Sequence, residues 1–179
     1  MEYTTCIKKA KEVVKIQRLP PKYSPNEGGI GEYNCYAYAL LLSSINWEGH
    51  EITPGFMSGP INLDNDIYWD HITGSGIIQY VKEDLEKLGR KMEEDSFDKK
   101  MEDGTYKIAI YVNENGFHLI RQNQDGSWSE KCGWAGRVEL IYPKYLLHDY
   151  KLIGVYKVSN QTKWKFTSSL IIIKLEDIM

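Results

Sequence analysis

Two residues that could act together as a nucleophile and a base lie far apart in this chain. Cys35 stands at the start of an apolar segment, directly after Asn34, and His118 lies in the apolar segment 116–120. Asparagine is a preferred helix N-cap, which would place Cys35 in a first turn, where the positive helix end favours a thiolate. An imidazole held by a strand is a common base for such a thiol. The pair therefore predicts a cysteine hydrolase.

Both residues also have ordinary structural interpretations. Cysteine is among the most buried residue types, and a lone histidine in a strand is more often a core or surface residue than a catalyst. Cys132 is a rival thiol, but no helix end is expected beside it, so Cys35 is the stronger candidate. A metal site built from Cys35, His118 and Cys132 has no supporting ligand spacing. We therefore expect no metal and no other cofactor.

A third polar group should orient the imidazole. Residues 124–126 fit a three-residue hairpin turn with Gly126 in the left-handed conformation. In that register His118 faces Cys132, and Glu130 lies on the same sheet face as a diagonal neighbour of His118. A shift of one residue would turn Glu130 to the opposite face, so the assignment depends on the register. The alternatives for this role are Gln122 and Asp125.

Several residues around Cys35 are candidates for binding the substrate. The backbone N–H of Cys35 could donate to an oxyanion, and Tyr33 is a candidate second donor. Asn34 and Trp128 complete the predicted oxyanion and substrate residues. The irregular segment 46–69 is expected to form part of a substrate groove, because long loops are often functional. Its aromatic residues are Trp47, Phe56, Tyr68 and Trp69.

The periodicity of apolar residues predicts an α+β fold, with helices first and antiparallel strands later. Helices are expected at about residues 4–17, 34–45 and 76–88, and strands at 106–112, 117–122, 127–132, 152–158 and 164–173. The charged segment 90–104 is expected to be exposed. Residues 1–179 are expected to form a single domain, with a core at about 25–160 and the N-terminal helix packed beside it.

Composition excludes several classes of function. The chain has 179 residues, a hydrophobic fraction of 42% and a net charge of −3, with no basic patch for nucleic acid. No apolar run is long enough for a membrane span, and no signal peptide is evident. Three cysteines without CxxC spacing argue against a disulfide framework. A cytoplasmic location is expected, or export by a route without a signal peptide. The oligomeric state stays open.

The motifs resemble a known superfamily. Residues 34–40, Asn-Cys-Tyr-Ala-Tyr-Ala-Leu, are similar to the nucleophile helix of papain-like bacterial cysteine peptidases of the NlpC and CHAP kind. The resemblance covers about residues 25–135, and similar strings occur in a group of bacterial and phage proteins. The other matching segments are Pro54-Gly55-Phe56, Ser58-Gly59, residues 118–122, Asp125-Gly126, Trp128-Ser129, Lys131 and Gly133.

This resemblance implies a papain-like core in which the nucleophile helix packs on an antiparallel sheet. It implies Cys35 as nucleophile, His118 as base and a polar third residue on the next strand. Where the family pattern reads Trp-Ser-His-Lys-Pro-Gly, this chain has Glu130 in place of the histidine. The implied reaction is cleavage of a peptide or isopeptide bond in a peptide, a peptidoglycan peptide or a protein. Acyl transfer or deamidation by the same residues, and a binding module without turnover, remain alternatives.

Overall fold

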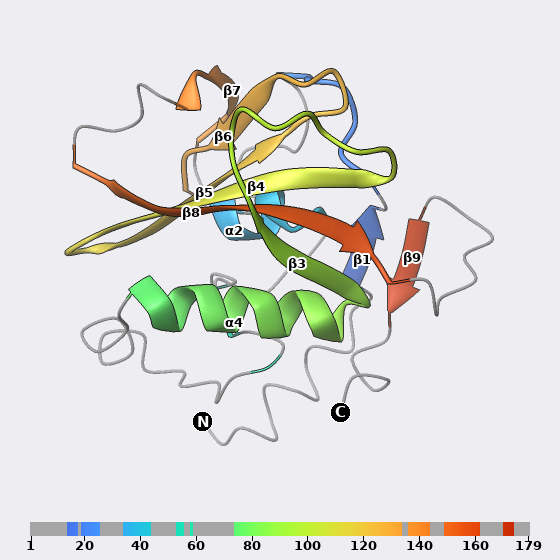
Figure 1. The fold of residues 1–179 in the computed structure, drawn as a ribbon, viewed down its shortest axis with the longest axis horizontal. Coiled ribbons are helices and arrows are strands. Elements are labelled where there is room, and N and C mark those ends of the chain that lie inside the picture. Colours follow the sequence, from blue (N-terminus) through green and yellow to red (C-terminus); the bar gives the residue numbers. More distant parts are fainter. Residues whose placement is uncertain are drawn as a thin grey trace.

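The fold is of the α+β class, with two helices and nine strands among the residues that the structure describes. This computed structural model describes residues 14–17, 19–25, 34–43, 53–55, 58, 74–133, 136–143, 149–161 and 170–173. The helices are α2 (Cys35–Ala39) and α4 (Gly74–Lys87). Figure 1 shows α4 beneath a large sheet, with α2 beside the middle strands of that sheet.

The strands form two sheets in which the paired strands are antiparallel. The six-stranded sheet has the order β3 (Arg90–Asp95), β8 (Lys151–Asn160), β4 (Thr105–Asn113), β5 (Gly116–Gln122), β6 (Trp128–Lys131) and β7 (Val138–Ile141). The three-stranded sheet has the order β2 (Leu42–Ser43), β1 (Val14–Gln17) and β9 (Leu170–Ile173).

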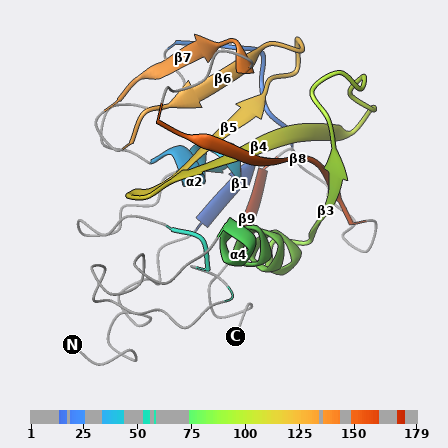
Figure 2. The ribbon, with the colours of Figure 1, turned by 60° about the vertical axis from the view of Figure 1, so that its left-hand side comes forward.

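Alternating residues of β4 and β5 build two hydrophobic clusters on opposite faces of the large sheet, because successive strand residues point to opposite sides. Leu119 belongs to the larger cluster, which α2 and α4 cover. Ile120 belongs to the smaller cluster, together with Trp128 of β6. In Figure 2, β6 and β7 form the edge of the sheet that lies farthest from α4. His118 shares the face of Ile120 and therefore points away from the main core.

The helix that carries Cys35 is shorter than predicted. The expected helix over residues 34–45 is wrong beyond Ala39, where α2 ends. Leu41 adopts a left-handed conformation with φ of 59°, which an α-helix cannot accommodate. Residues 42–43 then pair with β1 as a strand. Long-range strand pairing has overridden the local helical pattern.

Two buried arginines hold the C-terminal end of α2. Arg121 donates from Nη1 to the carbonyl of Tyr38 at 3.2 Å, and Arg90 donates from Nη1 to the carbonyl of Leu40 at 2.7 Å. The guanidinium carbon of Arg121 also lies 3.9 Å from the ring centroid of Tyr38. The last carbonyls of a helix lack partners within the helix, so these bonds stabilise a helix of only five residues.

Other segments correct the sequence expectations. The predicted helix over residues 4–17 is wrong at residues 14–17, which form β1 and pair with β9, and its earlier part lies outside the described residues. Residues 90–95 form the strand β3, in which Arg90 and Met92 are buried rather than exposed. Strand β7 was not predicted at all. The strands around His118 lie where the sequence predicted them.

Candidate active site

Cys35 is the first residue of α2, and Asn34 caps the helix as predicted. The Asn34 side chain accepts a hydrogen bond through Oδ1 from the backbone N–H of Ala37 at 3.0 Å. Cys35 is 6% exposed, so its thiol lies just below the surface. As a first-turn residue, Cys35 has a backbone N–H without a partner inside the helix. The cap therefore fixes both the sulfur and a donor group at the same end of the helix.

His118 and Glu130 come together through the predicted hairpin. Gly126 has φ of 85°, and the N–H of Asn123 donates to the carbonyl of Ser127 at 2.7 Å. Ile120 pairs with Glu130, so Glu130 is a diagonal neighbour of His118 and the predicted register is confirmed. Nε2 of His118 lies 2.7 Å from Oε2 of Glu130, and both side chains are buried.

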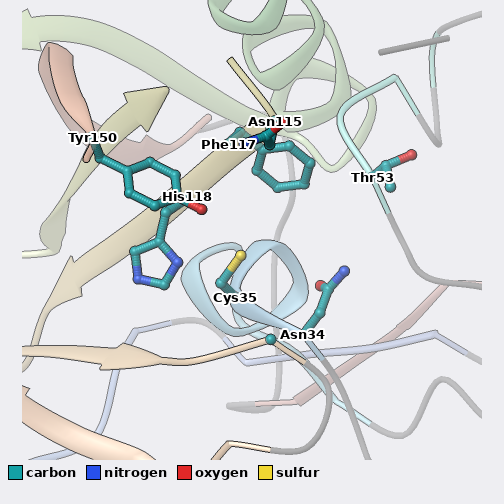
Figure 3. A pocket seen from close by; sticks show the side chains of 9 residues that line it. Asn34, Cys35, Thr53, Asn115, Phe117, His118 and Tyr150 are labelled. Carbon is teal, nitrogen blue, oxygen red and sulfur yellow. The ribbon is translucent and has the colours of Figure 1, made fainter. Parts of the chain in front are cut away.

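The bond to Glu130 occupies one ring nitrogen of His118 and leaves the other for Cys35. Figure 3 shows this second nitrogen, Nδ1, on the side of the ring that faces the Cys35 sulfur. Burial alone would lower the pKa of His118, but hydrogen bonds and charges from Cys35 and Glu130 outweigh it and raise the pKa to about 9. His118 is therefore an imidazolium at neutral pH, which is the state that pairs with a thiolate.

Cys35 and His118 open into one pocket of about 250 Å³. Figure 3 shows Tyr150 on the same side of the pocket as His118, and Thr53 on the opposite side of Cys35. The rings of His118 and Tyr150 have their centroids 6.1 Å apart. Asn34 and Phe117 also line the pocket. A ligand in this space would therefore contact both members of the candidate dyad.

The other predicted site residues lie elsewhere. Trp128 does not line the pocket, because it packs edge-on against Phe97 in the smaller cluster with ring centroids 5.1 Å apart. The Gln122 side chain donates to the carbonyl of Gly126, and the Asp125 carboxylate accepts from Ser127 and from the backbone N–H of Tyr23, so neither side chain holds His118. Tyr33 and the aromatic residues predicted for the groove lie outside the described residues.

The rival thiol of Cys132 lies near Glu130 but in a different environment. Burial, the negative charges of Glu130 and Glu139, and a hydrogen bond to Glu130 raise the pKa of Cys132 to about 11. Cys132 is therefore protonated at neutral pH and is a poor nucleophile. This difference supports the ranking of Cys35 above Cys132.

Sequence reasoning did not single out four side chains that line the pocket, those of Thr53, Asn115, Phe117 and Tyr150. Thr53 lies in the segment 46–69, which the sequence predicts as part of the groove, Asn115 lies in the turn between β4 and β5, and Tyr150 directly precedes β8. Long-range pairing of β4 with β8 brings Tyr150 beside His118, whereas Asn115 lies near His118 through the local β4–β5 hairpin, and no motif marks either residue. Among the residues that the structure describes, no cluster of His, Cys, Asp and Glu could hold a metal ion. Within that part of the chain, no helix combines the length and the apolar character of a membrane span.

The pKa of His118 provides a test of the role of Glu130. Replacing Glu130 with glutamine removes a negative charge and should lower the pKa of His118 from about 9 by about one unit or more. Titration of the imidazole C–H resonances by NMR measures this change. Glu139→Gln is the matched control, because Glu139 is exposed and directly opposite Glu130 on β7. If the pKa of His118 is the same in Glu130→Gln as in the wild type, Glu130 does not act on His118.

Comparison with known proteins places the chain in a family. A family model with the description "Domain of unknown function (DUF7689)" matches residues 26–151. This range includes Cys35, His118 and Glu130. No curated protein matches the chain, and no solved structure matches it.

Proposed function

The chain belongs to the DUF7689 family, a domain of unknown function, and from the geometry of its pocket we propose that it is a thiol hydrolase that cleaves an amide bond. The observation that carries the proposal is the 2.7 Å contact between His118 and Glu130, which leaves the other ring nitrogen directed at Cys35. The residue order and the elements also support a papain-like core, with a thiol on a helix and a histidine on an antiparallel sheet.

In the proposed reaction, Cys35 attacks as a thiolate beside the His118 imidazolium. The sulfur adds to the substrate carbonyl, and the backbone N–H of Cys35 donates to the resulting oxyanion. Asn34 lines the same pocket, and its amide group is a suitable second donor. His118 then gives its Nδ1 proton to the departing amine. It afterwards takes a proton from the water that releases the acyl group, which restores the starting pair.

Glu130 has an orienting role in this scheme. Its carboxylate accepts from Nε2–H of His118, so the ring presents Nδ1 to the sulfur, and its charge stabilises the imidazolium. In the papain-like family pattern that the sequence resembles, the residue at the position of Glu130 is a histidine. A carboxylate performs the same task in the serine hydrolases, where aspartate holds the imidazole. The substitution is therefore compatible with turnover.

The described part of the pocket favours a neutral substrate segment. Besides Cys35 and His118, the lining side chains are amides, hydroxyls and aromatic rings, those of Asn34, Thr53, Asn115, Phe117 and Tyr150. Such groups bind the backbone of an extended peptide and an uncharged side chain. We therefore favour a peptide or isopeptide bond as the target.

Alkylation of Cys35 tests the activation of the thiol without knowledge of the substrate. Iodoacetamide should modify Cys35 faster than Cys132 at neutral pH, because the proposed reaction places an imidazolium beside the Cys35 sulfur. Mass spectrometry of the digested protein assigns the modified cysteine and compares Cys35 with Cys132. A rate for Cys35 that rises only near the ordinary cysteine pKa of about 8.5 would contradict the hydrolase and favour a binding module.

Product analysis then separates the reactions that the same residues permit. A panel of peptides and isopeptides is incubated with the protein and with its Cys35→Ser variant, and the masses of the products are measured by mass spectrometry. Hydrolysis adds one water across the cleaved bond, deamidation converts a carboxamide to a carboxylate, and transfer joins two panel members. A panel that yields only transfer or deamidation products would overturn the assignment as a hydrolase.

A further inference from the structure

The sequence motif Pro54-Gly55 with Ser58 has no role in the dyad, yet the structure ties it to the active site through one buried carboxylate. Asp84 lies on α4 with no exposed surface. Its Oδ2 accepts from the backbone N–H of Gly55 at 2.9 Å, and its Oδ1 accepts from the hydroxyl of Ser58 at 2.7 Å. Residues 53–55 and Ser58 are called the wall segment below, because Thr53 forms one side of the pocket.

The same carboxylate also reaches the helix of the nucleophile. The hydroxyl of Tyr36, the residue after Cys35, donates to Oδ2 of Asp84 at 2.6 Å. The ring of Tyr36 packs edge-on against Phe117, which lines the pocket, with centroids 6.1 Å apart. Asp84 therefore connects the wall segment, α2 and, through Tyr36, the floor of the pocket at Phe117.

The residue types of the wall segment suit an anchoring contact with Asp84. Gly55 has φ of 89°, a conformation that residues with a side chain rarely adopt, and it directs its N–H to the carboxylate. A buried carboxylate is costly unless hydrogen bonds satisfy it, so the three bonds, two from the wall segment and one from α2, tie both segments to α4. A change at Asp84 should therefore move the pocket side that carries Thr53, while the bond between His118 and Glu130 on the sheet stays in place.

We propose that Asp84 is a positioning residue that holds the wall segment against the nucleophile helix and so sets which acyl groups reach Cys35. The inference rests on the proposed function and adds to it the part of the molecule that controls access to the thiol. Asp84 touches neither Cys35 nor His118 in the contacts described, so it acts through the wall segment and Tyr36.

Two alkylating reagents with the same reactive group provide the test. Iodoacetamide is small and reports the reactivity of the thiol, whereas iodoacetanilide carries a phenyl ring that must fit between Thr53 and Tyr150. In Asp84→Asn, the rate ratio of iodoacetanilide to iodoacetamide at Cys35 should rise about threefold or more, because the released wall segment widens the pocket. The iodoacetamide rate itself should stay within about twofold.

Further variants separate positioning from folding. Ser58→Ala removes one bond to Asp84 and should shift the ratio in the same direction by a smaller factor, which keeps the test valid if Asp84→Asn folds poorly. Glu86→Gln is the matched control, since Glu86 is exposed on the same helix. An unchanged ratio in both Asp84→Asn and Ser58→Ala, or rates for both reagents that fall together, would overturn the proposal.

A readout independent of Cys35 distinguishes failure of this inference from failure of the proposed function. Hydrogen exchange of the Gly55 amide should be slow in the wild-type chain and faster in Asp84→Asn, because its acceptor is the Asp84 carboxylate. If Cys35 of the wild type does not react at all, the hydrolase proposal fails while the exchange result still reports on the wall segment. An equal exchange rate in both proteins would refute the anchoring role.

Discussion

Cys35→Ser should lower the second-order rate constant for hydrolysis of the best panel peptide by roughly a thousandfold or more. Every covalent step of the proposed reaction passes through the Cys35 sulfur, and a serine hydroxyl beside His118 is a far weaker nucleophile than a thiolate. The side chains differ by one atom, and Cys35 is buried at the start of α2, so the variant should fold normally. Initial rates for wild type and variant, with circular dichroism as a check on folding, measure the effect.

Cys132→Ser is the control for this substitution. Cys132 is protonated at neutral pH and lies outside the pocket lining, so its loss should change the rate by less than about tenfold. A Cys35→Ser protein that retains most of its activity would refute the proposed nucleophile. A larger loss in Cys132→Ser than in Cys35→Ser would transfer that role to Cys132.

The site was predictable where local signals determine it. Asn34 is a capping residue by type, and the turn before Ser127 requires a left-handed residue that Gly126 supplies. Once the turn is placed, the period of two along the strands puts Glu130 beside His118 without any knowledge of the rest of the fold. The cap beside Cys35 and the pairing of Glu130 with His118 therefore follow from short-range rules, whereas the approach of Cys35 to His118 depends on the packing of α2 against the sheet.

The parts that were missed depend on partners far away in the chain. Leu41 and its neighbours read as helix, but pairing of Ile16 with Leu42 makes a strand there. Asp84 reads as a polar position on an amphipathic helix, and its bond to Tyr36 joins residues 48 positions apart. Trp128 was predicted for the substrate site because of its motif, yet it fills the smaller cluster. No local pattern encodes such contacts, since they arise only when the sheets form.

His118→Gln should reduce hydrolysis by roughly a thousandfold or more and should also change the pH dependence of folding stability. Glutamine can still donate a hydrogen bond to Glu130, so the buried carboxylate keeps a partner, but no group remains to exchange protons with Cys35. Rate measurements at about pH 7 test the first effect. Activity within about tenfold of the wild type would remove His118 from the mechanism.

The stability effect follows from the sign of the pKa shift. The pKa of His118 rises from the ordinary 6.5 to about 9 in the folded chain, so folding favours the protonated ring. This stabilisation is complete below pH 6.5 and is lost as the pH rises through about 9. Urea unfolding across this range should show a free energy of unfolding that falls in the wild type and falls less in His118→Gln. Parallel curves for the two proteins would mean that His118 has no charged partners in the folded state, and the pairing with Cys35 and Glu130 would then be wrong.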